Sequence, residues 1–203
     1  TSTTIALEPV GEESTLPQAA LRRTFDKYFE TALTKRTYTP YEWRTVGSFI
    51  RFGEKHRALE LVRYLFRDQR PSGWNEWAEV VHEDLRKPAF IGDMPHTWVG
   101  SDFIRSALDL FVYERESENA IVIGAGVSAE WLDSGIRIAG LRTQYGLVSY
   151  SMKTEGDAVR ITIDAATAVP PGGIVVVSPL DGSESIVRTA PASLSLPVHR
   201  SRQ

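Results

Sequence analysis

Two short segments of the chain combine aromatic side chains with carboxylates and a histidine. The first is Trp74–Trp77 (WNEW), and the second is Gly92–Trp98 (GDMPHTW). Aromatic walls with a few polar groups are typical of binding clefts, and an indole ring offers an apolar face on which a sugar ring stacks. The pattern therefore predicts a carbohydrate-binding site. Its candidate substrate contacts are Trp74, Trp77, Asp93, His96 and Trp98.

Five carboxylates of the first half are candidates for chemistry: Glu42, Glu76, Glu79, Asp93 and Asp102. Hydrolysis of a glycosidic bond needs two carboxyl groups, one that donates a proton and one that acts as base or nucleophile. Glu76 is the preferred base, because its neighbouring tryptophans are expected to desolvate its carboxylate. Glu42 fits the capping box of a helix that opens at Thr39 equally well. Asp102 fits a structural role in a first helical turn.

The same residues also have ordinary structural explanations. Large aromatic side chains dominate protein cores, so the tryptophans fit hydrophobic packing as well as a cleft. An isolated histidine such as His96 is more often hydrogen-bonded inside a core than catalytic. The sequence leaves both interpretations open.

The elements that position these segments are predicted to be helices. Apolar side chains at helical spacing predict helices over about 18–34, 39–53, 58–66 and 101–113. Short turns between helices favour antiparallel hairpins. The stretch 68–100 lacks periodicity, and long connections of this kind inside a domain are usually functional or disordered. This one is too aromatic to be disordered.

The second half has the pattern of a small antiparallel β-sandwich. Short β-branched runs predict strands over 120–123, 135–139, 147–152, 159–163 and 174–177. Turn signals separate them, and the inner faces of two such sheets need one another for burial.

The fold class is therefore α+β, with three regions along the chain. We expect a helical domain over 1–115, a β-sandwich over 116–182 and a frayed tail over 183–203.

Composition excludes several classes of function. The 203 residues carry a net charge of −3 and contain no cysteine, so neither a nucleic-acid footprint nor a thiolate metal site is expected. The four histidines lack ligand spacing, which argues against a metal centre. No apolar run is long enough to span a membrane, and the glycine patterns match neither a nucleophile elbow nor a dinucleotide fingerprint. We expect no cofactor.

The order of the motifs resembles the end of the catalytic domain of bacterial six-hairpin glycosidases, especially the inverting α-L-rhamnosidases. In that family a Trp/Glu/Trp cluster precedes a loop with a histidine and a Gly-Ser step into the last helix of an (α/α)6 barrel. Gly100-Ser101 is such a step here, and 140–151 is similar to part of the family's C-terminal sandwich. The chain is also similar to the C-terminal region of bacterial proteins called coagulation factor 5/8 type (discoidin) domain proteins.

This resemblance implies a role for each matched residue. Glu76 would be the general base that activates a water, Trp74 and Trp77 the walls facing the sugar, and His96 a contact to a substrate hydroxyl. Asn75 stands where the family typically has its glutamate. The family's general acid lies far upstream.

The resemblance covers 18–180, which is an incomplete (α/α)6 barrel and its sandwich. It implies a C-terminal fragment of a glycoside hydrolase that is inactive alone and belongs to a secreted or periplasmic protein. Helix faces near Phe25, Phe49 or Phe103 would be exposed, or covered by the rest of the polypeptide or another chain. The alternatives are a non-catalytic carbohydrate-binding protein and a purely structural unit.

Overall fold

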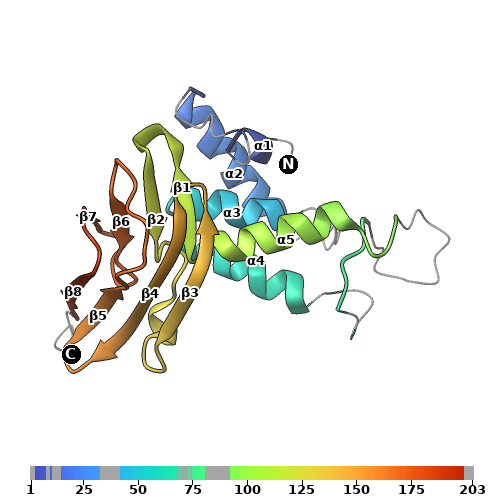
Figure 1. Cartoon of the computed structure of the whole chain (residues 1–203). Helices are drawn as coiled ribbons and strands as arrows, with labels where there is room; N and C mark the ends of the chain where they lie inside the picture. The colour runs from blue at the N-terminus through green and yellow to red at the C-terminus, as the bar shows by residue number, and fades with distance from the viewer. Residues whose placement is uncertain are drawn as a thin grey trace. The chain divides into compact units, whose positions relative to one another are not determined.

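The computed structural model has an α+β fold of two compact units, Thr1–Asp109 and Leu110–Gln203 (Figure 1). It describes residues 3–7, 10, 15–32, 42–67, 69, 73, 75–80 and 92–198. The first unit is helical and the second consists of strands, which confirms the predicted class. The boundary between the two units falls after Asp109 in the sequence, whereas 115 was expected. Val112–Arg115 is already a strand of the second unit.

The described part of the first unit contains the helices α1 (Thr4–Leu7), α2 (Gln18–Ala32), α3 (Trp43–Arg51), α4 (Lys55–Arg67) and α5 (Thr97–Asp109). Four of them were predicted, and α1 was not. The fourth predicted helix begins earlier than expected, at Thr97, and ends earlier, at Asp109. Thr39, the first residue of the expected capping box, lies outside the described residues. Glu42 stands at the N-cap of α3, and its side chain makes no cap hydrogen bond.

Helices α3 and α5 lie side by side and run in the same direction. A guanidinium nitrogen of Arg44 lies 2.9 Å from a carboxylate oxygen of Asp102, and one of Arg51 lies 3.3 Å from Asp109. The two ion pairs follow in the same order along both helices, so the helices are parallel. Between them the Ser106 hydroxyl donates to the carbonyl of Trp43 at 2.7 Å. This seam is polar and closely packed.

Helices α2 and α4 cover α3 with aromatic and charged contacts. Phe25 and Phe29 meet the Phe49 ring edge to face, with centroids 5.7 and 5.6 Å away. Arg57 of α4 pairs with Asp26 of α2 and lies over the Phe29 ring. Phe25 and Phe49 are therefore buried by helices of the same unit, so neither marks an exposed face.

The apolar face near Phe103 is different. Ile104 and Leu108, one turn apart on α5, are 57% and 42% exposed. Exposure was expected at this place, and it leaves an uncovered apolar stripe on the last helix of the unit.

The second unit contains two four-stranded sheets. Sheet A has the order β1-β2-β6-β7, and sheet B has the order β3-β4-β5-β8. The strands are β1 (Val112–Arg115), β2 (Ala120–Ile123), β3 (Ile136–Thr143), β4 (Gly146–Glu155), β5 (Ala158–Ile163), β6 (Ile174–Val177), β7 (Glu184–Val187) and β8 (Ala192–Pro197).

The two sheets share one aliphatic core. Ile121 and Ile174 of sheet A and Val148 and Ile161 of sheet B belong to the same buried cluster, and none of them is exposed. All neighbouring strands are antiparallel except β2 and β6. That pair is parallel because the chain passes through β3, β4 and β5 of the other sheet before β6 returns beside β2. The fully antiparallel expectation is wrong at this pair.

The expected tail is wrong as well, because β7 and β8 occupy most of it. In β8, Leu194 and Leu196 face the core while Ser193 and Ser195 face outward. This alternation of leucine and serine is a strand pattern. The prolines at both ends of the segment obscured it. Residues 199–203 lie outside the described part.

A long side chain crosses the outer face of sheet A. Arg115 of the edge strand β1 pairs with Glu184 of the opposite edge strand β7, at 2.6 Å. The hydrogen bonds that the Arg115 guanidinium donates to the Glu184 carboxylate raise the pKa of Arg115 and lower the pKa of Glu184. Their pair bridges the two central strands, whose outward residues Val122 and Val175 are buried.

Candidate functional site

The two motif segments lie against each other. The Glu79 N–H donates to the Asp93 carbonyl at 2.9 Å, and the His96 N–H donates to the Trp77 carbonyl at 2.8 Å. A third backbone bond runs from Gly92 to Val80 at 3.3 Å. These bonds join residues 77–80 to 92–96 in the manner of two antiparallel strands. The pairing leads directly into the first turn of α5.

Trp77 fixes this pair of segments to the helices. Its ring contacts Trp43, Phe66 and Phe103 at centroid distances of 5.1, 5.9 and 5.3 Å, and those three rings also contact one another. Such edge-to-face packing stabilises each aromatic pair beyond simple burial. Trp77 is only 8% exposed, so its ring serves the core and offers little surface to a sugar. Trp74 lies outside the described residues.

Trp98 has the opposite environment. It is 54% exposed, and the guanidinium carbon of Arg44 lies 5.1 Å from the centroid of its ring. Arg44 is in turn held by Asp102, which is 1% exposed and also pairs with Arg105 at 2.6 Å. The buried carboxylate thus fixes Arg44, and Arg44 supports one face of the indole ring. Trp98 is therefore an exposed aromatic ring whose one face rests on an arginine held by a buried carboxylate.

His96 begins helix α5. Its Nδ1 atom accepts a hydrogen bond from the Val99 N–H at 3.3 Å, and its carbonyl accepts one from Gly100 at 3.0 Å. The imidazole therefore acts as the N-terminal cap of the helix, a role usually taken by serine, threonine or aspartate. Because histidine is a poor sequence signal for a cap, the helix was expected to begin only at Ser101.

The two acidic candidates on the segments, Glu76 and Asp93, are exposed to solvent. The expectation that tryptophans would desolvate Glu76 is wrong, since the neighbouring Trp77 turns into the core instead. The Glu76 backbone has one contact to the end of α4, where the Gln69 side-chain amide donates a hydrogen bond to the Glu76 carbonyl at 3.4 Å.

A further polar cluster at the start of α3 was missed by the sequence reasoning. The Tyr28 hydroxyl lies beside the Glu42 carboxylate and the Thr45 hydroxyl; burial first, and then the charge of Glu42, raise the pKa of Tyr28. Oε2 of Glu42 and Oγ1 of Thr45 are buried without a hydrogen-bond partner among the described residues. Glu42 had been recognised as a candidate, but its neighbour Tyr28 comes from a different helix.

Comparison with protein-family models, with curated proteins and with solved structures returned no match to this chain. Within the described residues, no three side chains are grouped as ligands for a metal ion. None of the helices in that same part of the chain has the length and apolar character needed to cross a bilayer.

Proposed function

We propose that the chain belongs to a carbohydrate-active protein and that its helical unit binds a glycoside at the end where α3 and α5 begin. The observation that carries the proposal is Trp98, a half-exposed indole ring supported on one face by Arg44. Glu76, Asp93 and His96 belong to the segments paired beside the same helix start. A flat apolar ring among hydroxyl-binding groups suits a sugar, which has both apolar faces and hydroxyl edges.

The helix arrangement supports the finer proposal of an (α/α)6-type barrel. The parallel helices α3 and α5 are separated in sequence by α4, whose last turn brings Phe66 to Trp43 at the start of α3. Alternating helices of this kind form two layers of opposite direction. The exposed Ile104 and Leu108 give a further helix a face to cover. We propose that the rest of the same polypeptide or another chain supplies that cover.

The proposed chemistry is hydrolysis with inversion at the anomeric carbon. Glu76, as general base, takes a proton from a water that attacks this carbon, while a carboxylic acid from elsewhere protonates the leaving glycosidic oxygen. The bond to the leaving group breaks as the bond to the water oxygen forms. Glu76 lies on a segment held by backbone bonds, which fixes its place relative to Trp98.

One observation favours binding without cleavage as the second candidate. Glu76 is exposed, and an exposed carboxylate lacks the environment that tunes a general base. In this version, Trp98 and the paired segments hold a glycan that the protein does not cut.

In a full-length protein that supplies the general acid, turnover of a panel of glycosides by Glu76→Gln and by the matched control Glu60→Gln, on the exposed side of α4, separates the two candidates. For the hydrolase, Glu76→Gln should abolish turnover and preserve glycan binding, while Glu60→Gln changes neither. Turnover that survives Glu76→Gln removes Glu76 from the mechanism. Saturable binding without turnover by the wild-type protein supports the binding function.

A further inference from the structure

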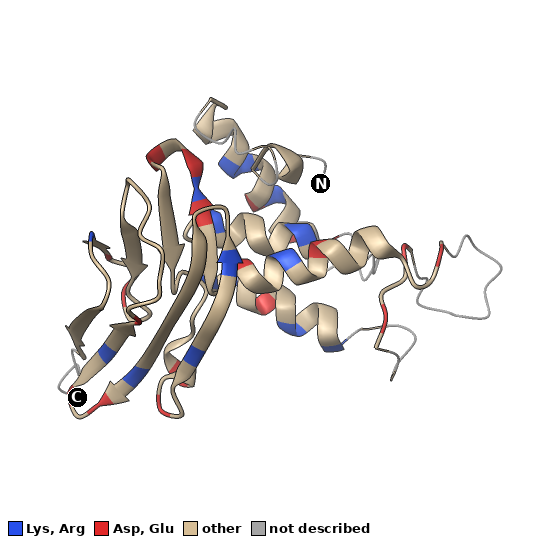
Figure 2. Cartoon of the chain, viewed as in Figure 1, with Lys and Arg blue, Asp and Glu red and all other residues tan. Residues whose placement is uncertain are grey.

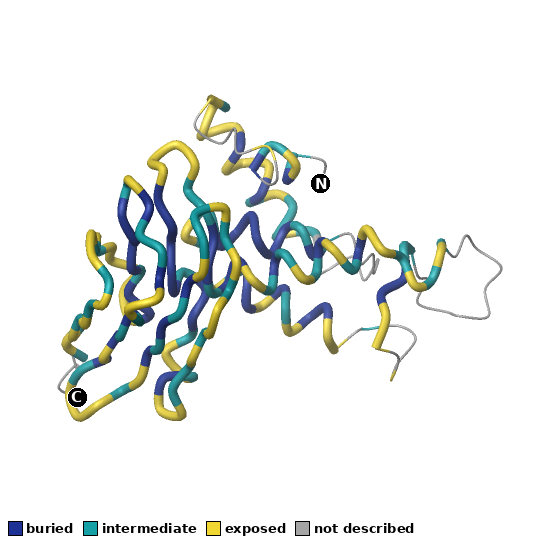
Figure 3. Tube along the Cα trace, in the orientation of Figure 1, coloured by how far each residue is buried: buried dark blue, intermediate teal, exposed yellow. Residues whose placement is uncertain are grey.

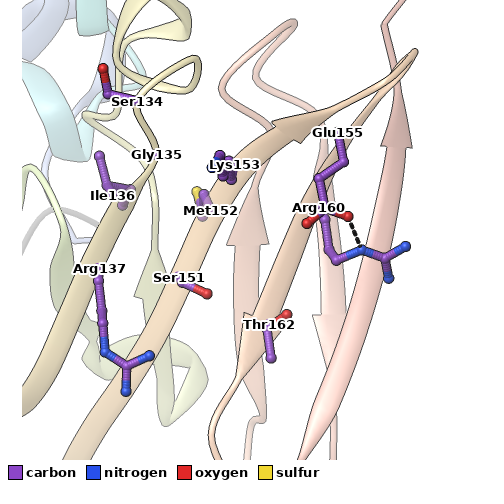
Figure 4. A pocket seen from close by; sticks show the side chains of 10 residues that line it. All are labelled: Ser134, Gly135, Ile136, Arg137, Ser151, Met152, Lys153, Glu155, Arg160 and Thr162. Atoms are coloured by element: carbon purple, nitrogen blue, oxygen red, sulfur yellow. Dashed lines mark hydrogen bonds and ion pairs between the residues drawn. The ribbon is translucent and has the colours of Figure 1, made fainter.

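The outer face of sheet B contains a shallow groove with a volume of about 280 Å³. The groove lies over β3, β4 and β5, as Figure 4 shows. Its lining residues are Ser134, Gly135, Ile136, Arg137, Ser151, Met152, Lys153, Glu155, Arg160 and Thr162. It belongs to the second unit and shares no residue with the site around Trp98.

The strand register arranges two rows of polar side chains in this groove. Arg137, Ser151 and Thr162 are direct partners across β3, β4 and β5, and Ser193 of β8 continues the row. Lys153 and Arg160 are partners in the next row. Adjacent strands are about 4.8 Å apart, so the side chains within a row are neighbours. The hydroxyl groups of Ser151 and Thr162 therefore lie beside the cations Lys153 and Arg160, two residues away along the same strands. Figure 2 shows the basic positions on these three neighbouring strands.

The three cations of the groove differ in whether they form an ion pair with a carboxylate. Arg137 pairs with Asp164 at 3.2 Å, and Arg160 pairs with Glu155. No carboxylate in the described part of the chain pairs with Lys153. The stem of Lys153 packs over Gly135, where a Cβ atom would lie 3.3 Å from its Cγ and Cδ atoms. Among the described residues, the Lys153 ammonium group is therefore the cation of the groove without a paired carboxylate.

We propose that this groove binds an acidic saccharide, meaning a sugar unit that carries a carboxylate or a sulfate. Lys153 takes the anionic group, as a charge-assisted hydrogen bond is stronger than a neutral one. The hydroxyls of Ser151 and Thr162 and the Arg160–Glu155 pair offer donors and acceptors to the sugar hydroxyls. The proposal does not depend on glycoside binding or cleavage in the helical unit.

The same features disfavour other ligands. None of the described residues that line the groove is aromatic, so neither the stacking of a neutral sugar nor the stacking of nucleic-acid bases is supported. Glu155 places a negative charge at the rim, which opposes a polyphosphate but accepts hydrogen bonds from sugar hydroxyls. A saccharide with a single acidic group on each unit fits this mixture.

Calorimetric titration of the whole chain with oligogalacturonate and with a neutral oligosaccharide of equal length tests the proposal. The wild-type protein should bind the acidic sugar preferentially, and Lys153→Gln should weaken that binding about tenfold. Added salt should weaken it too. The matched control Lys27→Gln removes the same charge from the exposed face of α2 and should leave the affinity unchanged.

A second variant tests the row of hydroxyl groups. Thr162→Val keeps the shape of the side chain and should weaken binding of the acidic sugar while its circular dichroism spectrum stays native. Equal affinity for the neutral sugar, equal loss in Lys27→Gln, or binding of inorganic polyphosphate that is as tight and is insensitive to Thr162→Val would each overturn the proposal.

Discussion

The interior of the helical unit and the interior of the sandwich are built from different side chains. Between α3 and α5 lie two nearly buried carboxylates, Asp102 and Asp109, each paired with arginine. Between the two sheets the buried cluster is almost wholly aliphatic, and the central strands β2 and β6 of sheet A are buried over most of their length (Figure 3). Both units have apolar cores, and the helical unit adds buried charge pairs at the contact between α3 and α5.

This difference bears on how independent each unit is. An aliphatic core is non-directional and tolerates small changes, whereas a buried ion pair needs both partners and good geometry to offset desolvation. Both units expose large apolar side chains, but Ile104 and Leu108 lie one turn apart on the same helix, whereas Leu147 and Ile186 lie on strands of different sheets. We infer that the helical unit is the one that depends on additional contacts.

The largest effect should come from breaking one buried pair. Asp109→Ala removes a carboxylate that pairs with the Arg51 guanidinium, whose side chain is 8% exposed. The expected loss of unfolding free energy is about 3–5 kcal/mol, measured by urea unfolding followed through tryptophan fluorescence. The exposed Asp133 provides the control Asp133→Ala, which should change stability by less than about 0.5 kcal/mol.

Replacing both partners distinguishes pairing from simple packing. Arg51→Met combined with Asp109→Ala should be more stable than Asp109→Ala alone, because no uncompensated charge remains. A double variant less stable than the single one would show that the charges are not what holds this seam.

A smaller effect is expected from two glycines that occupy helices in different surroundings. A Cβ atom at Gly47 would lie 2.7 Å from Oδ2 of Asp109, whereas one at Gly100 has no atom within 4 Å. Gly47→Ala should therefore cost about 1–3 kcal/mol through overpacking. Gly100→Ala should gain up to about 1 kcal/mol from helix propensity. Thermal unfolding of both variants measures the contrast, and a stabilised Gly47→Ala would refute the close approach of α3 and α5.

The smallest effect should be found in the sandwich core. Ile161 is fully buried and Ile186 is 55% exposed, so the same change can be compared in both environments. Ile161→Val should cost about 0.5–1.5 kcal/mol, and Ile186→Val close to nothing. Chemical denaturation provides both values. Equal losses would show that the core of the second unit is not where its stability lies.

The sequence predicted those elements whose pattern is local. The stripe of Ala58, Leu59 and Leu65 defines α4, and the alternation in Val159–Ile163 defines β5, because each depends only on helical or strand period. The alternation of leucine and serine in β8 is also a local strand pattern, but the prolines on either side of it led to the prediction of a tail. Local pattern is thus sufficient for most elements of this fold.

The contacts that build the candidate site were not predictable in the same way. Nothing near Trp77 shows that it meets Trp43 and Phe103 from two other helices, so its burial and the exposure of Glu76 follow only from the assembled unit. Asp102 was predicted to have a structural role in a first helical turn, but it lies further along α5 and pairs with Arg44 of a different helix. Pairings of this kind depend on distances between elements, which a single sequence does not contain.

The proposed glycoside site is tested most directly by calorimetric titration of the chain with a panel of neutral oligosaccharides, comparing wild-type protein with Trp98→Ala. Ile104→Ala, which removes another exposed apolar side chain from the same helix, is the control. We expect saturable binding that Trp98→Ala weakens about tenfold, as expected for the loss of one aromatic contact, and that Ile104→Ala leaves unchanged. Binding of equal strength in all three proteins, or no binding to any member of the panel, would contradict the proposal.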